Sequence, residues 1–176
     1  MEKLACIFPG QGVQYPGMGK SIYEKYEVVK STYGEASEVA GFDVADLCFN
    51  GPLMMQNDIT RMQIINVITG VAFYRAFFEE YHVLPQFFAG HSMGEYAAYV
   101  CCGAIRLKDA VKILLERGRL LQKAIDEQRG YMAVVEKLRS DEIRKCIAEK
   151  EFKKVVIACY NDVLQHTVSG DTEELD

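Results

Sequence analysis

The sequence predicts an α/β fold: a parallel sheet flanked by helices, followed by a small subdomain of strands and one helix. Short apolar runs at residues 4–8 and 87–90 each precede a turn and a helical segment, which is typical of parallel strands. Long stretches with apolar residues at helical spacing follow both runs. After Gly130 the predicted elements become shorter and mostly extended, which indicates a second structural region.

The N-terminal segment predicts a strand and a loop that can approach a ligand. Residues 4–8 are uniformly apolar and end at Pro9, which favours a fully buried, central strand. Residues 10–19 contain four glycines, so their backbone is either a mobile connection or a close neighbour of a ligand. A phosphate-binding G-x-x-x-x-G-K-[ST] loop is excluded because Gln14 stands where its first glycine belongs.

The predicted helices contain polar residues whose exposure can be predicted from helical spacing. Helices are predicted for residues 18–40, 44–49, 60–81 and 107–126, with Asp58 or Thr60 capping the third. Gln63 and Asn66 interrupt the apolar surface of the third helix, and spacing alone favours exposed polar positions for both. Arg117, in the last helix, is likewise typical of a solvated helix face.

Residues 90–94 form a G-x-S-x-G motif, with Ser92 between Gly90 and Gly94. The glycines let a strand turn sharply into a helix, so that the serine hydroxyl is exposed at the corner. The backbone N–H groups after the serine then lie at a helix N-terminus, where negative charge is stabilised. The motif predicts a nucleophile elbow, with an ordinary strand–helix turn as the alternative.

The C-terminal region predicts a β-α-β-β order. Strands are expected at residues 131–135, 155–160 and 166–169, and a helix at 140–149 with Ser140 as its cap. This order is that of a split-βαβ, ferredoxin-like subdomain, which needs a further helix and strand. Residues 171–174 resemble the first turn of that helix, so we expect the sequence to end within the motif. The predicted domains are residues 1–128 and 129–176.

Composition excludes several classes of partner. The chain has 176 residues, is 49% hydrophobic and has a net charge of −5, so it lacks the basic surface that nucleic acids or anionic membranes require. No segment predicts a signal peptide, a membrane span or a metal site. The six cysteines form no C-x-x-C pair and are expected to be buried thiols of a reducing cytoplasm.

Several motifs together resemble malonyl-CoA:acyl-carrier-protein acyltransferases of fatty-acid and polyketide synthesis. They are Phe8-Pro9-Gly10-Gln11-Gly12, Gln63, Gly90-His91-Ser92-Met93-Gly94-Glu95, Arg117-Gly118-Arg119 and Gly130-Tyr131-Met132-Ala133. The resemblance covers the whole chain. It implies a hydrolase-like core with a parallel sheet and nucleophile elbow, an inserted, here incomplete, ferredoxin-like subdomain, and two-step transfer through an acyl-serine.

The resemblance also assigns roles to individual residues. Ser92 would attack a coenzyme A thioester, and the N–H groups of Gln11 and Met93 would hold the oxyanion. Arg117 would pair with the free carboxylate of a malonyl-type group. Two further substrate-site residues are Gln63, which would line the pocket, and His91, which would orient the elbow. The substrates would be malonyl-CoA and an acyl carrier protein, with no further cofactor.

One expected element is missing from the match. The family's general base is a histidine downstream of the subdomain, and His82, His91 and His166 are not expected to replace it. We therefore expect the sequence to be part of a longer acyltransferase. The alternatives are an acyl hydrolase that clears carrier-protein thioesters and a non-catalytic fragment that binds carrier protein.

Overall fold

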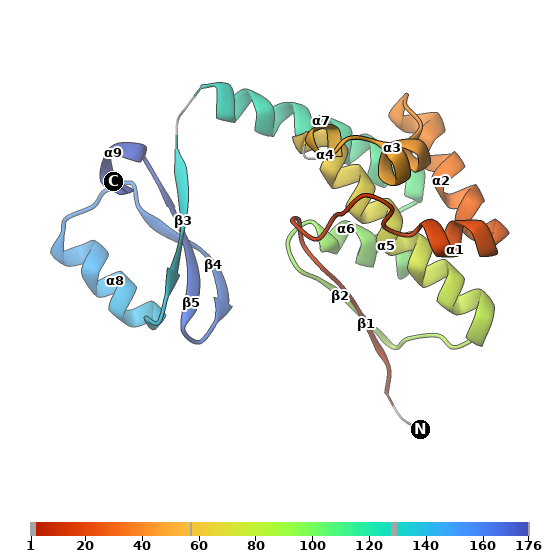
Figure 1. Ribbon diagram of the computed structural model, residues 1–176. Helices are drawn as coiled ribbons and strands as arrows, with labels where there is room; N and C mark the ends of the chain where they lie inside the picture. The colour runs from red at the N-terminus through yellow and green to blue at the C-terminus, as the bar shows by residue number, and fades with distance from the viewer. Residues whose placement is uncertain (1–2, 57, 128–129, 176) are drawn as a thin grey trace. The chain divides into compact units, whose positions relative to one another are not determined.

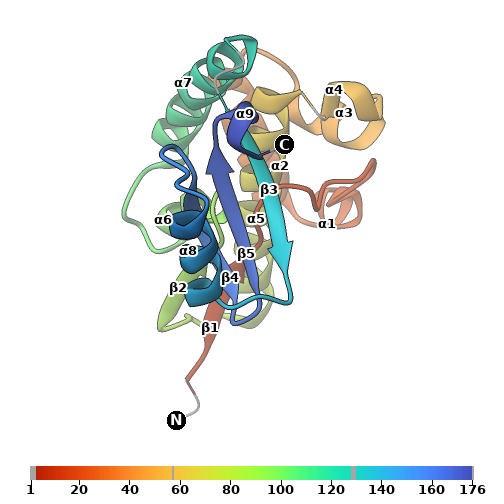
Figure 2. The same ribbon diagram turned by 90° about the vertical axis from the view of Figure 1, so that its left-hand side faces the viewer.

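The computed structural model describes residues 3–56, 58–127 and 130–175 (Figure 1, Figure 2). The chain divides into two compact units, Met1–Gln122 and Lys123–Asp176. The domain boundary expected between residues 128 and 129 lies outside the described residues.

A parallel pair of strands forms the sheet of the first unit. β1 (Ala5–Phe8) pairs with β2 (Phe87–Gly90), from Ala5 opposite Phe87 to Phe8 opposite Gly90. The prediction that β1 is central and fully buried is wrong for the described chain, because Phe8 is buried while Ile7 is 74% exposed. Successive strand residues point to opposite faces, and the described helices cover only the face that carries Phe8.

Helices make up most of the first unit. They are α1 (Lys20–Lys25), α2 (Glu27–Ala40), α3 (Val44–Asn50), α4 (Leu53–Gln56), α5 (Ile59–Tyr81), α6 (Gly94–Cys101) and α7 (Leu107–Asp126). The helix predicted for residues 18–40 is divided at Tyr26, whose backbone is extended at φ −118° and ψ 127°. The carboxylate of Asp58 caps α5 by accepting the N–H of Arg61 at 3.0 Å. α7 has the predicted bounds.

α5 is the central helix of the first unit's core. Its residues Ile64, Ile65 and Ile68 are fully buried. The hydroxyls of Tyr33, on α2, and Thr69, on α5, are 2.8 Å apart, and burial raises the pKa of Tyr33. These contacts fix the helix that carries Gln63 and Asn66.

The second unit contains an antiparallel sheet in the order β3-β5-β4 (Figure 2). Its elements are β3 (Tyr131–Glu136), α8 (Ser140–Glu149), β4 (Val156–Asp162), β5 (Gln165–Gly170) and α9 (Thr172–Leu175). The last strand lies between the first two, as in a split-βαβ motif. Arg139, not Ser140, is the N-cap of α8, because Glu142 accepts the Arg139 N–H at 2.7 Å. That the subdomain is inserted into the core stays a prediction.

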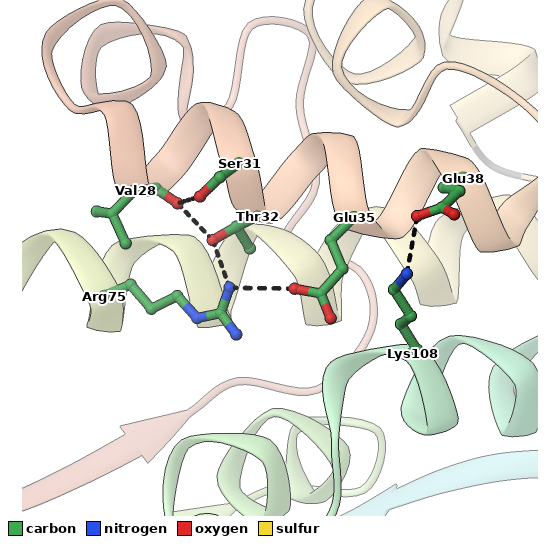
Figure 3. Close-up of polar contacts among 7 residues, drawn as sticks. All are labelled: Val28, Ser31, Thr32, Glu35, Glu38, Arg75 and Lys108. Carbon is green, nitrogen blue, oxygen red and sulfur yellow. Dashed lines mark hydrogen bonds and ion pairs between the residues drawn. The ribbon is translucent and has the colours of Figure 1, made fainter.

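Polar contacts hold α2 against α5 and α7 (Figure 3). Arg75, on α5, donates to the Thr32 hydroxyl at 2.9 Å and lies 3.6 Å from the Glu35 carboxylate. Lys108, near the start of α7, pairs with Glu38 at 2.8 Å. The Lys108–Glu38 pair is exposed and contributes about 0–1 kcal/mol, whereas Arg75 and Glu35 are half-buried.

The described helices contain none that is long and apolar enough to cross a membrane. All six cysteines are free thiols. The expectation that they are buried is wrong for Cys102 and Cys146, which are exposed at the end of α6 and on the outer face of α8.

Candidate active site

Ser92 lies at a strained turn between β2 and α6. Its φ is +52°, a left-handed conformation that costs a non-glycine residue energy, and its side chain is exposed. A Cβ on Gly90 would lie 2.1 Å from the carbonyl carbon of Gly94, and one on Gly94 would lie 2.4 Å from the Phe8 oxygen. Both flanking residues must therefore be glycine. Such a turn defines the chain as an α/β protein with a nucleophile elbow.

The backbone at the start of α6 leaves one N–H beside the serine unpaired. The N–H groups of Gly94 and Glu95 donate to the carbonyl oxygens of His91 and Ser92 at 2.9 and 3.1 Å. The Met93 N–H forms no hydrogen bond with any described residue, although its side chain is buried. It therefore remains available for negative charge that develops near Ser92.

The glycine-rich loop reaches the elbow through Gly10. A Cβ on Gly10 would lie 2.7 Å from Nδ1 of His91 and 3.2 Å from its carbonyl oxygen, so the loop backbone lies directly against this histidine. The His91 N–H also donates to the Phe8 oxygen at 3.0 Å. Gln11 follows Gly10, and its N–H forms no hydrogen bond within the described chain. The structure thus brings the residue preceding Gln11 against His91, next to Ser92 in the chain.

Arg117 and Gln63, the two expected substrate-site residues on the long helices, contact each other. Gln63 is fully buried, so its interpretation as an exposed polar residue is wrong. Its Nε2 donates to the Ile59 oxygen at 2.7 Å, and its Oε1 accepts a hydrogen bond from Nη1 of Arg117. Arg117 is half-buried, so its interpretation as a solvated surface residue is also wrong.

A close helix contact explains this burial. A Cβ on Gly118 would lie 2.2 Å from Oγ1 of Thr60, so only glycine allows α7 to approach the start of α5 this closely. This approach places the neighbouring Arg117 within hydrogen-bond distance of Gln63. Gly118 after Arg117 thus lets α7 approach α5 closely enough for the Arg117–Gln63 hydrogen bond, which helical spacing alone does not predict.

The Arg117 guanidinium has no carboxylate partner among the described residues. The neighbouring Glu116 pairs instead with Arg119, at 2.6 Å. Arg117 lines an open hollow of about 540 Å³ along α7, which also carries Leu120, Leu121, Lys112 and Glu116. A half-buried guanidinium with unused N–H groups beside apolar side chains can bind a small carboxylate through two hydrogen bonds.

α5 contacts both Arg117 and the glycine-rich loop. Gln63 binds Arg117, and Asn66, one turn further along, donates to Oε1 of Gln14 in the glycine-rich loop at 3.0 Å. Neither Gln14 nor Asn66 was identified as a site residue from sequence. The one sequence signal for a role of Asn66 is that it interrupts the apolar face of the helix. The prediction of an exposed position is wrong, because Asn66 is half-buried.

No hydrogen bond from a described residue reaches the Ser92 hydroxyl. His82 is exposed at the C-terminal end of α5, and His166 is buried in β5 of the second unit. The described side chains include no group of three or more His, Cys, Asp or Glu placed to hold a metal ion.

Comparison with known proteins identifies relatives of this chain. The model of the acyl transferase domain family matches residues 5–176. A malonyl CoA-acyl carrier protein transacylase of Bacillus subtilis is 36% identical over all of this chain and 44% of its own length. The structure of such a transacylase from Coxiella burnetii matches 99% of this chain and 56% of its own, with TM-score 0.92 and 32% identity.

A third relative was solved with its partner. It is a malonyl-transacylase in complex with a type II PKS acyl-carrier protein, and it matches 99% of this chain and 57% of its own, with TM-score 0.90 and 34% identity. The chain thus spans about half the length of the relatives it matches. It belongs to the acyl transferase domain family.

Proposed function

We propose that this chain carries the nucleophile and the acyl-binding arginine of a malonyl-type acyltransferase. The acyl group would move from coenzyme A, through an ester on Ser92, to the phosphopantetheine thiol of an acyl carrier protein. The observation that carries the proposal is the exposed, left-handed Ser92 within the same unit as an arginine that has no carboxylate partner among the described residues. The names of the relatives, a malonyl CoA-acyl carrier protein transacylase and a malonyl-transacylase bound to an acyl-carrier protein, support the same substrates.

The first step would form the acyl-serine. Oγ of Ser92 attacks the thioester carbonyl, its proton passes to a general base, and the negative charge develops on the carbonyl oxygen. The N–H groups of Met93 and Gln11 would stabilise that oxygen. The C–S bond then breaks, and coenzyme A leaves as the thiol after taking up a proton. No histidine of the described residues fills the role of base through a hydrogen bond to Ser92.

The second step would reverse the first with a different thiol. The phosphopantetheine thiol passes its proton to the general base as its sulfur attacks the ester carbonyl, and the same N–H groups hold the oxyanion. The base returns that proton to Oγ of Ser92 as the C–O bond breaks. During both steps Arg117 would hold the free carboxylate of the acyl group. Buried Gln63 would keep the guanidinium in place through the hydrogen bond from Arg117.

The proposal also covers the cofactor and the cellular location of the protein. The reaction needs no cofactor besides the coenzyme A thioester itself, because the acyl group is carried by Ser92. A cytoplasmic location is supported by the six free thiols, which are typical of reducing compartments.

The test is the product formed from malonyl-CoA and an acyl carrier protein. We expect malonyl-carrier protein by intact mass spectrometry, and none with Ser92→Ala. Free malonate as the main product would replace the transferase by an acyl hydrolase. A Ser92→Ala protein that still loads the carrier would contradict the assignment of the nucleophile.

A further inference from the structure

We propose that Asn66 and Gln14 are positioning residues that hold the glycine-rich loop so that the Gln11 N–H faces Ser92. This inference rests on the proposed function, because it assigns the two residues a purpose in stabilising the oxyanion. It also makes a separate claim about the order of the loop, which can be tested without catalysis.

The side chain of Gln14 closes the loop on itself and on α5. Its Oε1 accepts a hydrogen bond from the backbone N–H of Gly12 at 3.1 Å and another from Nδ2 of Asn66 at 3.0 Å. Gly12 has φ +94°, so the chain reverses sharply there. Gln11, whose N–H would bind the oxyanion, thus lies between Gly10, which contacts His91, and Gly12, which is bound by Gln14.

The orientation of both amides follows from backbone groups of fixed polarity. The Gly12 N–H can only donate, so the oxygen of the Gln14 amide must face it. The Met62 carbonyl can only accept, and it receives a hydrogen bond from Nδ2 of Asn66 at 2.9 Å. The nitrogen of Asn66 therefore faces Met62 and Gln14, and its oxygen points away from the loop.

That oxygen offsets the stability that the two hydrogen bonds from Nδ2 contribute. Oδ1 of Asn66 is buried and has no hydrogen-bond partner among the described residues. An apolar side chain of similar size would remove the unpaired oxygen from an otherwise apolar part of α5. The gain from the asparagine is instead its contact with the loop. Asn66 also lines a hollow of about 440 Å³ whose wall includes Pro9, Val13 and Met93.

The consequence for catalysis is geometric. An oxyanion donor works only when its N–H is within hydrogen-bond distance of the developing charge, and a shift of about 1 Å can cost up to about 100-fold in rate. Without Asn66, the loop would lose its side-chain hydrogen bond to α5, and the Gln11 N–H would sample positions away from Ser92. The maximal rate of Ser92 acylation should fall, whereas the acyl carboxylate would still bind Arg117.

The test compares Asn66→Leu with the unchanged chain in three measurements. Thermal unfolding should change little, because the loss of the two hydrogen bonds from Nδ2 is offset by removal of the unpaired oxygen. Hydrogen exchange of the peptide covering residues 9–17 should be roughly 5- to 10-fold faster, while the buried part of α5 should be unaffected. The maximal rate of Ser92 acylation by malonyl-CoA should fall about 10-fold, with little change in half-saturation.

Further variants separate positioning from a general structural effect. Gln14→Glu keeps an oxygen that accepts from Gly12 and Asn66, so it should retain more loop protection than Gln14→Leu. Asn50→Leu is the matched control, because it removes an amide hydrogen bond to Asp46, 3.0 Å long, on the surface of α3. It should change neither loop exchange nor acylation.

Each outcome decides between the two claims. Unchanged exchange of the loop in Asn66→Leu, or faster exchange with an unchanged acylation rate, would overturn the positioning proposal. A lower unfolding temperature with uniformly faster exchange would also overturn it, because Asn66 would then be a stability residue. If the full-length protein without substitutions is not acylated, the proposed function fails, and the exchange experiment alone decides whether Asn66 orders the loop.

Discussion

The Arg117→Ala variant should discriminate between malonyl and acetyl groups. The guanidinium has N–H groups beyond the one used by Gln63, so it can donate two hydrogen bonds to the malonyl carboxylate. A hydrogen bond to a charged group contributes about 1.5–3 kcal/mol, and Arg117 is only half-buried, which favours the lower value. Two such bonds give about 3 kcal/mol, or roughly 150-fold in the rate of malonyl loading.

The same substitution has a second, non-selective effect. It leaves Oε1 of buried Gln63 without its hydrogen-bond donor, which costs about 1–3 kcal/mol of stability and affects both acyl groups alike. The assay is therefore the ratio of Ser92 acylation rates with malonyl-CoA and acetyl-CoA, measured by intact mass. The ratio should fall about 150-fold in Arg117→Ala.

A matched control lies two residues further along α7. Arg119 pairs with Glu116 at 2.6 Å and is exposed, so Arg119→Ala should leave the ratio unchanged. Equal losses of malonyl and acetyl loading in Arg117→Ala would refute the carboxylate-binding role and leave Arg117 as a structural partner of Gln63.

Three further predictions concern stability and thiol reactivity. Gly90→Ala should destabilise the fold by several kcal/mol, because the added Cβ would lie 2.1 Å from the backbone of Gly94. Gly34→Ala in α2, where an added Cβ meets nothing within 4 Å, should instead raise stability by about 0.5–1 kcal/mol. Equal melting temperatures of the two variants would contradict this. His166→Leu should keep or raise the melting temperature, because both ring nitrogens are buried without a partner among the described residues. A clear drop in melting temperature would show that a polar contact holds the ring. Burial raises the pKa of the Cys101 thiol, so less of its thiolate forms at pH 8. Iodoacetamide should therefore modify Cys101 more slowly than the exposed Cys102. Equal rates of labelling would argue against the burial of Cys101.

Local patterns in the sequence were enough to predict the helices and the elbow. The bounds of α7, the cap of α5 at Asp58 and the turn around Ser92 follow from apolar spacing, capping chemistry and glycine placement. These features depend on neighbours within a few residues of the chain. The division of the first predicted helix at Tyr26 was missed because no proline or glycine marks it.

Long-range packing decides the features that local patterns could not predict. Gln63 and Arg117 are 54 positions apart, and their contact depends on Gly118 meeting Thr60. Nothing in the spacing of either helix indicates that these two surfaces meet. The exposure of Ile7 has the same origin, because an apolar run predicts burial on both faces while the described helices cover one.

The central claim is that Ser92 carries the acyl group. The direct measurement is tandem mass spectrometry of peptides from the protein after brief reaction with malonyl-CoA. The account predicts a malonyl ester on the peptide that contains residues 90–95, located at Ser92 and absent from Ser92→Ala. A malonyl group on another residue, or an unmodified Ser92 peptide while malonyl-carrier protein accumulates, would contradict it.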